Sequence, residues 1–174
     1  SYATNAGDVA IANTSGRGNR NHRGMFWNGY LGGRSKLATC SDGTSNTMAF
    51  AEICVTGQDG DNKIKSAFAY VTSLASAPPA NCLALRGNSG QLLPDGKGPY
   101  SVKGRRWFDA RIACTSFNAV LPPNSPSCVG SGGGAKGDYT IATASSYHSG
   151  GVNVAMCDGS VHFVSETVDA GNAN

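Results

Sequence analysis

Residues 145–164 read SSYHSGGVNVAMCDGSVHFV, and their pattern predicts an antiparallel β-hairpin over 151–165. Asp158-Gly159 is a pair that two-residue type I′ turns prefer, because both central residues of that turn need a positive φ. Around such a turn Ala155 would face His162, and the strands would each present one apolar face and one polar face. The apolar face would hold Val152, Val154, Met156, Val161 and Phe163, and the polar face Asn153, Ala155, Cys157, Ser160 and His162.

Composition predicts one β-rich domain over residues 1–174. Charged residues make up 14% of the chain, and the net charge is +3. The longest basic run is Arg105-Arg106, which is too short for a nucleic-acid footprint, so we expect no nucleic-acid partner. The 24 glycines favour turns, loops and short strands over helices. The expected fold class is therefore α+β, predominantly antiparallel β, with long loops.

Further segments also have strand character. Residues 47–56 predict a buried strand, with a short helix starting near Ser45 as the alternative. Residues 66–73 and 139–144 also predict strands, and strand-like residues occur around Trp107-Phe108 and 117–120. Most of 75–104 is expected to be loop because of its prolines and glycines.

Six cysteines predict disulfides formed in an oxidising compartment: Cys40, Cys54, Cys82, Cys114, Cys128 and Cys157. No C-x2-C pair is present, which argues against a zinc-thiolate site. Fifteen pairings are possible. A short loop costs least to close, which favours Cys40 with Cys54 and leaves the other four to form two more bonds. With neither a signal peptide nor a span of ~20 apolar residues, we expect a processed or truncated chain.

Several blocks in sequence order resemble one family. His148 and Asp158-Gly159 match an H-x9-DG signature, and residues 42–52 match a "DGTSNT…E" block. Residues 107–128, which include Phe117–Asn124, resemble an "FN.VLPPN…C" block. Ser1–Gly7 is similar to a "SYA.N.G" segment. The resemblance is to the DUF1559 group, secreted proteins with a prepilin-type start. The residues that carry it are Asp42, Gly43, Ser45, Asn46, Thr47, Glu52, Asn118, Pro122, Pro123, Asn124, His148, Asp158 and Gly159.

The resemblance implies a pilin-like globular head whose amino-terminal helix is absent. Its expected function is that of a structural subunit of a type IV pilin- or pseudopilin-like filament, without catalysis. Expected partners are further copies or other pilin-like subunits, with membrane contact only through the missing helix. The expected location is extracellular or at the cell surface, with the periplasm as the alternative. A second function, from another class, is a carbohydrate- or surface-polymer-binding module that uses exposed Trp27, Tyr30 or Trp107.

The motif residues are expected to be structural. An extended 151–157 segment at ~3.3 Å per residue separates His148 from Asp158 by roughly 25–33 Å, so they do not form one reactive site. Asp158 and Gly159 belong to the turn. The 42–47 segment predicts a polar turn, with Glu52 bonding back to it. The sequence also lacks a G-x-S-x-G nucleophile elbow.

Calcium is the only candidate cofactor. Asp59, Asp61 and Asn62 offer clustered oxygen ligands in a loop, as Ca²⁺ prefers. The EF-hand pattern needs Glu at loop position 12, which counting from Asp59 is Tyr70. We therefore favour a plain polar turn at 58–63 and expect no cofactor.

Overall fold

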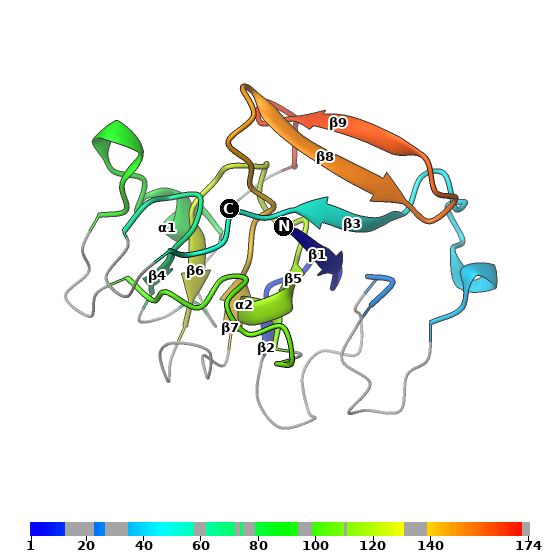
Figure 1. The fold of residues 1–174 in the computed structure, drawn as a ribbon, viewed down its shortest axis with the longest axis horizontal. Helices are drawn as coiled ribbons and strands as arrows, with labels where there is room; N and C mark the ends of the chain where they lie inside the picture. Colours follow the sequence, from blue (N-terminus) through cyan, green and yellow to red (C-terminus); the bar gives the residue numbers. More distant parts are fainter. Residues whose placement is uncertain are drawn as a thin grey trace.

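The computed structural model describes residues 1–12, 23–26, 35–57, 62–71, 74, 79–93, 99–109, 111–130 and 139–171. Their strands form two sheets, with strand orders β5-β1-β3-β8-β9 and β2-β7-β6-β4 (Figure 1). The strands are β1 (Tyr2–Asn5), β2 (Ile11–Ala12), β3 (Met48–Glu52), β4 (Phe68–Tyr70), β5 (Ser116–Phe117), β6 (Ser127–Val129), β7 (Tyr139–Ile141), β8 (Gly151–Met156) and β9 (Val161–Ser165). The helices α1 (Ala80–Leu83) and α2 (Ile112–Thr115) are one turn each, and η2 (Leu37–Thr39) and η3 (Asn88–Gly90) are 3-10 turns.

Most strand pairs are antiparallel, as the composition predicts. Parallel pairing occurs between β1 and β5 and between β4 and β6, whereas the other five pairs are antiparallel. The expected mostly β class is therefore confirmed. The predicted strand at 47–56 is also confirmed, because Met48–Glu52 pairs with β1 on one side and β8 on the other. β4 and β7 lie within the predicted strands 66–73 and 139–144.

The predicted hairpin forms, but its turn differs from the prediction by one residue. Ala155 faces Val161 and not His162. The backbone N–H of Met156 donates to the Ser160 carbonyl, and that of Gly159 donates to the Met156 carbonyl. Gly159 has φ +88°, and no positive φ occurs at Asp158. The type I′ prediction was therefore wrong: this is a three-residue loop, a type I turn followed by a left-handed glycine that forms a bulge.

This shift in register exchanges the two faces of β9. Val152 and Val154 are buried as predicted, but Val161 and Phe163 lie on the opposite face, where they are 67% and 54% exposed. His162 pairs with Val154 and shares its face. A slip of one residue sends every side chain of a strand to the other side of the sheet, which accounts for the wrong prediction.

Other segments also differ from the sequence predictions. Trp107 and Phe108 lie in an exposed turn and not in a strand. The turn leads into α2, whose residues Ile112 and Cys114 are buried. α1 occurs within the expected loop 75–104. A one-turn helix is too short to show an amphipathic pattern in the sequence, so these helices could not be predicted. Packing against the rest of the protein stabilises them.

The core consists of three groups of buried side chains. The inner face of the five-stranded sheet packs Ala3, Ala51 and Val152 against Phe117. The other two groups lie about the four-stranded sheet, one around Ile141 and the other around Phe68. Because alanine side chains are small, those of β1 and β3 allow the segment that packs on this face to approach the sheet closely.

One disulfide forms, between Cys82 of α1 and Cys128 of β6. The other four cysteines are free thiols, so the predicted Cys40–Cys54 bond is wrong. Cys40 precedes β3 and Cys54 follows it, and the extended strand holds them apart at ~3.3 Å per residue. Cys114 and Cys157, which were expected to pair within the remaining four, are free as well.

Candidate functional site

Two of the motif blocks meet at the amino end of β8. One carboxylate oxygen of Glu52 lies 3.1 Å from His148 Nε2, and the other accepts a 2.8 Å hydrogen bond from the Asn153 backbone N–H. Burial alone would raise the pKa of Glu52, but hydrogen bonds from Asn153 and Ser146 and the charge of His148 lower it. Glu52 therefore binds the start of β8. The expected bond from Glu52 back to the 42–47 turn is not made.

Asp158 lies at the other end of β8 and stabilises its own turn. Its Oδ1 accepts hydrogen bonds from the Ser160 hydroxyl, at 2.7 Å, and from the Ser160 backbone N–H, at 2.9 Å. These bonds lower the pKa of Asp158. His148 and Asp158 thus do not converge on an ion or on a common cleft.

The two asparagines of the middle motif block cross-link separate segments. Asn118 donates to the carbonyls of Val9 and Thr140 and accepts from the Ala142 N–H at 2.9 Å. Its side chain thereby links the segment ahead of β2 to β7 and to the residue that follows β7. Buried backbone groups need hydrogen-bond partners, so Asn118 cross-links these segments of the chain.

Asn124 also cross-links separate segments, close to the contact between Glu52 and His148. Its Oδ1 accepts from the Ser146 N–H at 2.9 Å, and its Nδ2 donates to Glu166 at 2.8 Å. Asn124 has φ +60°, a left-handed conformation that asparagine tolerates better than most residues. It follows Pro122-Pro123 in a turn closed by the Ser125 N–H and the Pro122 carbonyl.

The 42–47 segment forms the predicted polar turn. Gly43 adopts φ +88°, which favours glycine. Asn46 Nδ2 donates to the Asp42 carbonyl and Thr47 Oγ1 donates to the Gly43 carbonyl, at 2.9 and 3.0 Å. The neighbouring Ser45 faces an apolar groove instead.

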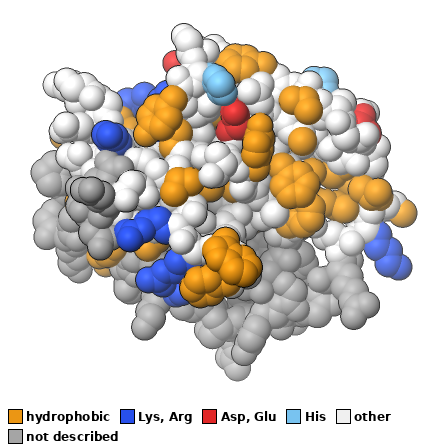
Figure 2. All heavy atoms as spheres, in the orientation of Figure 1, with side chains coloured by type: hydrophobic (Ala, Val, Ile, Leu, Met, Phe, Trp, Pro, Cys, Tyr) orange, Lys and Arg blue, Asp and Glu red, His pale blue; other side chains and the backbone are white. Residues whose placement is uncertain are grey.

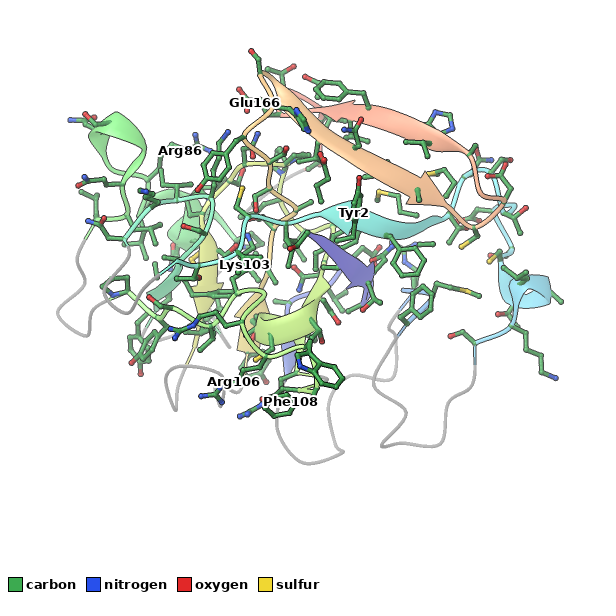
Figure 3. All side chains as sticks on the ribbon, in the orientation of Figure 1. Tyr2, Arg86, Lys103, Arg106, Phe108 and Glu166 are labelled. Carbon is green, nitrogen blue, oxygen red and sulfur yellow. A yellow bond between two sulfur atoms is a disulfide. The ribbon has the colours of Figure 1, made fainter. Side chains whose placement is uncertain are left out.

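No sequence pattern singles out Lys103, which is one of the most buried side chains. Its Nζ lies 2.8 Å from the Thr143 carbonyl, 2.9 Å from Ser145 Oγ, 3.1 Å from the Lys65 carbonyl and 3.2 Å from Ser127 Oγ. Figure 3 shows Lys103 in the interior of the molecule. Burial lowers the pKa of Lys103 to about 7, against a smaller opposing effect of the Cys54 thiol.

The hydroxyl protons around Lys103 are directed elsewhere. Ser145 donates to the Lys65 carbonyl, and Thr143 Oγ1 donates to the Ser125 carbonyl. Ser127 Oγ is 2.8 Å from Thr143 Oγ1, whose proton is already committed, so Ser127 donates there. All four oxygens around Nζ therefore accept hydrogen bonds, which suits an ammonium group with its three donors. Lys103 therefore joins separate segments in the interior.

An apolar groove of about 510 Å³ lies beneath the five-stranded sheet. Met48, Val154, Met156 and Val164 form its sheet side, and Val168 lies at its far wall. The shifted register brings His162 to the edge of this groove, on the sheet face opposite to the polar face predicted for it, and its side chain remains exposed. A smaller hollow of about 470 Å³ lies beside Glu52 and His148.

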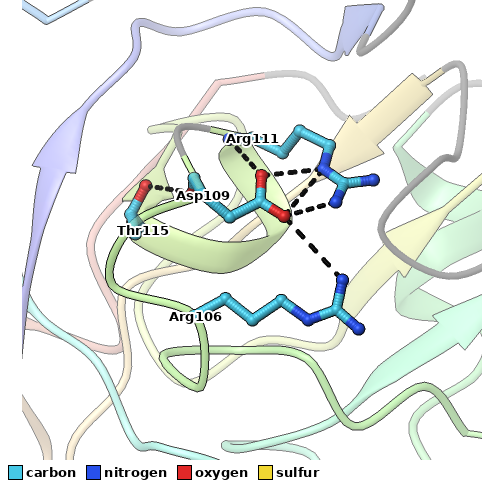
Figure 4. Close-up of polar contacts among 4 residues, drawn as sticks. All are labelled: Arg106, Asp109, Arg111 and Thr115. Atoms are coloured by element: carbon cyan, nitrogen blue, oxygen red, sulfur yellow. Dashed lines mark hydrogen bonds and ion pairs between the residues drawn. The ribbon is translucent and has the colours of Figure 1, made fainter.

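A cationic aromatic turn protrudes next to α2. Trp107 and Phe108 are 86% and 73% exposed, and their rings meet edge to face at 5.9 Å. Arg106 lies beside them, and Figure 2 shows basic side chains next to a protruding hydrophobic cluster on this face. Asp109 binds the Arg111 guanidinium, and its Oδ2 is 3.8 Å from Arg106 (Figure 4). The hydrogen bond from Arg111 lowers the pKa of Asp109.

The proposed calcium ligands lie largely outside the described residues. Asp59 and Asp61 are in this category, as are Trp27 and Tyr30 of the polymer-binding alternative. Asn62 is described, and its Nδ2 donates to Gln91 Oε1 at 3.4 Å. Among the described residues, no group of three His, Cys, Asp or Glu side chains is arranged to hold a metal ion.

The fold and these contacts define a two-sheet, mostly β protein whose motif side chains bind its own backbone. A model of the family described as proteins of unknown function (DUF1559) matches residues 1–171, and the chain belongs to that family. Neither a curated protein nor a solved structure matches the chain.

Proposed function

We propose that this chain is the globular head of a pilin- or pseudopilin-like subunit, which assembles and displays a surface without catalysis. The observation that carries the proposal is the use of the polar family residues. Glu52, Asn118 and Asn124 bond backbone groups of distant segments, and Asp158 bonds its own turn. A catalytic group must instead direct its donor or acceptor at a substrate.

The groove beneath the sheet supports assembly through an apolar helix. Its volume of about 510 Å³ and its row of aliphatic and thioether side chains suit the helix-in-groove mode of recognition. The occupant that we propose is the amino-terminal helix of a pilin-like subunit. No helix within the described ranges is long and apolar enough to cross a membrane.

A position outside the cell is part of the same proposal. The Cys82–Cys128 bond supports it, because disulfides persist in oxidising compartments and are rare in the cytosol. The low content of charged residues, which argues against a nucleic-acid partner, is also consistent with a position outside the cell.

The test is assembly of the full gene product in the cell that makes it. Immunogold electron microscopy with an antibody against this head should label filaments or the cell surface. Val168→Asp, at the half-exposed groove wall, should abolish that labelling pattern, whereas Val161→Asp on the opposite sheet face should retain it. Full-length protein that remains soluble and monomeric after processing would refute the proposal.

The exposed Trp107 supports a second candidate, binding of an acidic surface polymer. The turn 105–108 combines two exposed aromatic rings with two arginines, which suits stacking and charge pairing with an anionic chain. Pull-down on an acidic polysaccharide should lose its signal in Trp107→Ala and keep it in Phe163→Ala, a matched loss of an exposed ring. Equal binding by both variants would exclude this surface.

A further inference from the structure

Two free thiols lie beside each other where the β8–β9 turn meets the loop ahead of β3. The Cys40 thiol lies close enough to Cys157 to contribute to raising the pKa of the Cys157 thiol. Both thiols are partly exposed, in contrast to the buried Cys54 and Cys114. They are 117 positions apart in sequence, so their contact comes from the tertiary fold.

A chain of hydrogen bonds holds the two backbones in this arrangement. The Cys157 N–H donates to the Thr47 carbonyl at 2.8 Å, and Thr47 Oγ1 donates to the Gly43 carbonyl at 3.0 Å. The Gly43 N–H in turn donates to the Cys40 carbonyl at 3.0 Å. Figure 1 shows the hairpin tip next to the segment that leads into β3. The polar family turn at 42–47 therefore positions one thiol against the other.

We propose that Cys40 and Cys157 form a second disulfide, which ties the tip of the β8–β9 hairpin to the loop before β3. β9 is an edge strand, and the bond would hold its hairpin to the rest of the sheet. The Cys40 thiol donates to Met25 Sδ at 3.9 Å, so a third, non-titrating sulfur lies beside Cys40.

The reaction is thiol–disulfide exchange with a small disulfide such as oxidised glutathione. The Cys40 thiolate attacks one glutathione sulfur, and the other glutathione leaves as a thiolate. The Cys157 thiolate then attacks Cys40 Sγ and releases the second glutathione. The protein loses two protons and two electrons, and the glutathione disulfide is reduced to two thiols. Burial and the neighbouring Cys40 raise the pKa of Cys157, so exchange should accelerate as the pH rises.

Peptide mapping tests the proposal. The reduced protein is re-oxidised with glutathione disulfide, its remaining thiols are alkylated, and it is cleaved at basic residues and at glutamates. Cleavage after Glu52 separates Cys40 from Cys54, and cleavage after Lys136 places Cys157 in a peptide with no other cysteine. We expect one cross-linked species that joins these two peptides, lighter by two hydrogen atoms than their sum.

The variants give the controls. Cys157→Ser should remove the cross-linked species and leave Cys40 alkylated, whereas Cys114→Ser should retain it. In wild type the melting temperature should rise on oxidation after Cys82–Cys128 is complete, and Cys157→Ser should lose that rise. The proposal fails if Cys40 or Cys157 pairs with a different cysteine, or if both are alkylated once Cys82–Cys128 has formed.

Discussion

Glu52 and His148 are 96 residues apart in sequence, yet their side chains lie 3.1 Å from each other. Glu52 also accepts two hydrogen bonds from Asn153, at 2.8 and 3.3 Å. The carboxylate is mostly buried and the imidazole is mostly exposed. The two residues therefore contribute unequally, although both belong to family motifs.

Replacing each partner should show that inequality. Glu52→Ala leaves the Asn153 N–H without its partner, and we expect it to lower the free energy of unfolding by about 2 kcal/mol. His148→Ala removes only an exposed contact, and we expect less than about 1 kcal/mol. Urea denaturation measures both. A larger loss in His148→Ala would contradict the assignment.

Acid should weaken the same contact. The folded-state pKa of Glu52 is lowered below its ordinary value, so its stabilising contribution is present above that ordinary value. The contribution is lost as the pH falls through the lowered folded pKa. Unfolding measured from pH 6 to pH 3 should show a smaller decline in Glu52→Gln than in wild type. Parallel curves would argue against a lowered pKa.

Lys103 should make the free energy of unfolding depend on pH in the alkaline range. Its folded pKa of about 7 lies below the ordinary 10.5, so between these values the unfolded chain binds a proton that the folded chain lacks. The free energy of unfolding then rises with pH, by up to about 1.4 kcal/mol per pH unit. Denaturation at pH 7.5 to 9 should show this slope, and Lys103→Met should lack it. The same slope in both proteins would assign it to other groups.

The hairpin turn can be tested with two glycine exchanges. Gly159→Ala should cost about 1 kcal/mol or more, because alanine is strained at φ +88°. Asp158→Gly should also destabilise, by about 1 kcal/mol, since it adds backbone freedom and removes the bonds to Ser160. In a type I′ turn, which needs a positive φ at Asp158 as well, the second exchange would be neutral or stabilising.

Asn118 provides the strongest test of the proposal that the polar family residues cross-link distant segments. Asn118→Ala leaves two carbonyls and one N–H without their side-chain partner in the interior. We expect a loss of at least about 2 kcal/mol, or failure to fold. Asn46→Ala is a matched control in an exposed turn, and it should cost less than about 1 kcal/mol. Equal losses would show that burial of the amide is unimportant.

Local sequence was sufficient for the features whose cause is local. The Asp158-Gly159 turn between β-branched runs predicted a hairpin, and the 47–56 segment predicted a strand, because turn chemistry and side-chain alternation act over a few residues. The motif blocks also identified the family over nearly the whole chain. The turn type was wrong by one residue, since two- and three-residue loops suit the same Asp-Gly pair.

The remaining features depend on contacts between distant segments. Glu52 and His148 are in contact although they are 96 positions apart. Lys103 is buried among four segments and bonds residues up to 42 positions away. The disulfide joins Cys82 and Cys128 across 46 positions. Loop-closure entropy favoured the short Cys40–Cys54 pairing, but β3 keeps those residues apart and brings Cys40 to Cys157. Such contacts follow from which strands pair and which distant segments pack together, and a pattern of neighbouring residues carries no information about that arrangement.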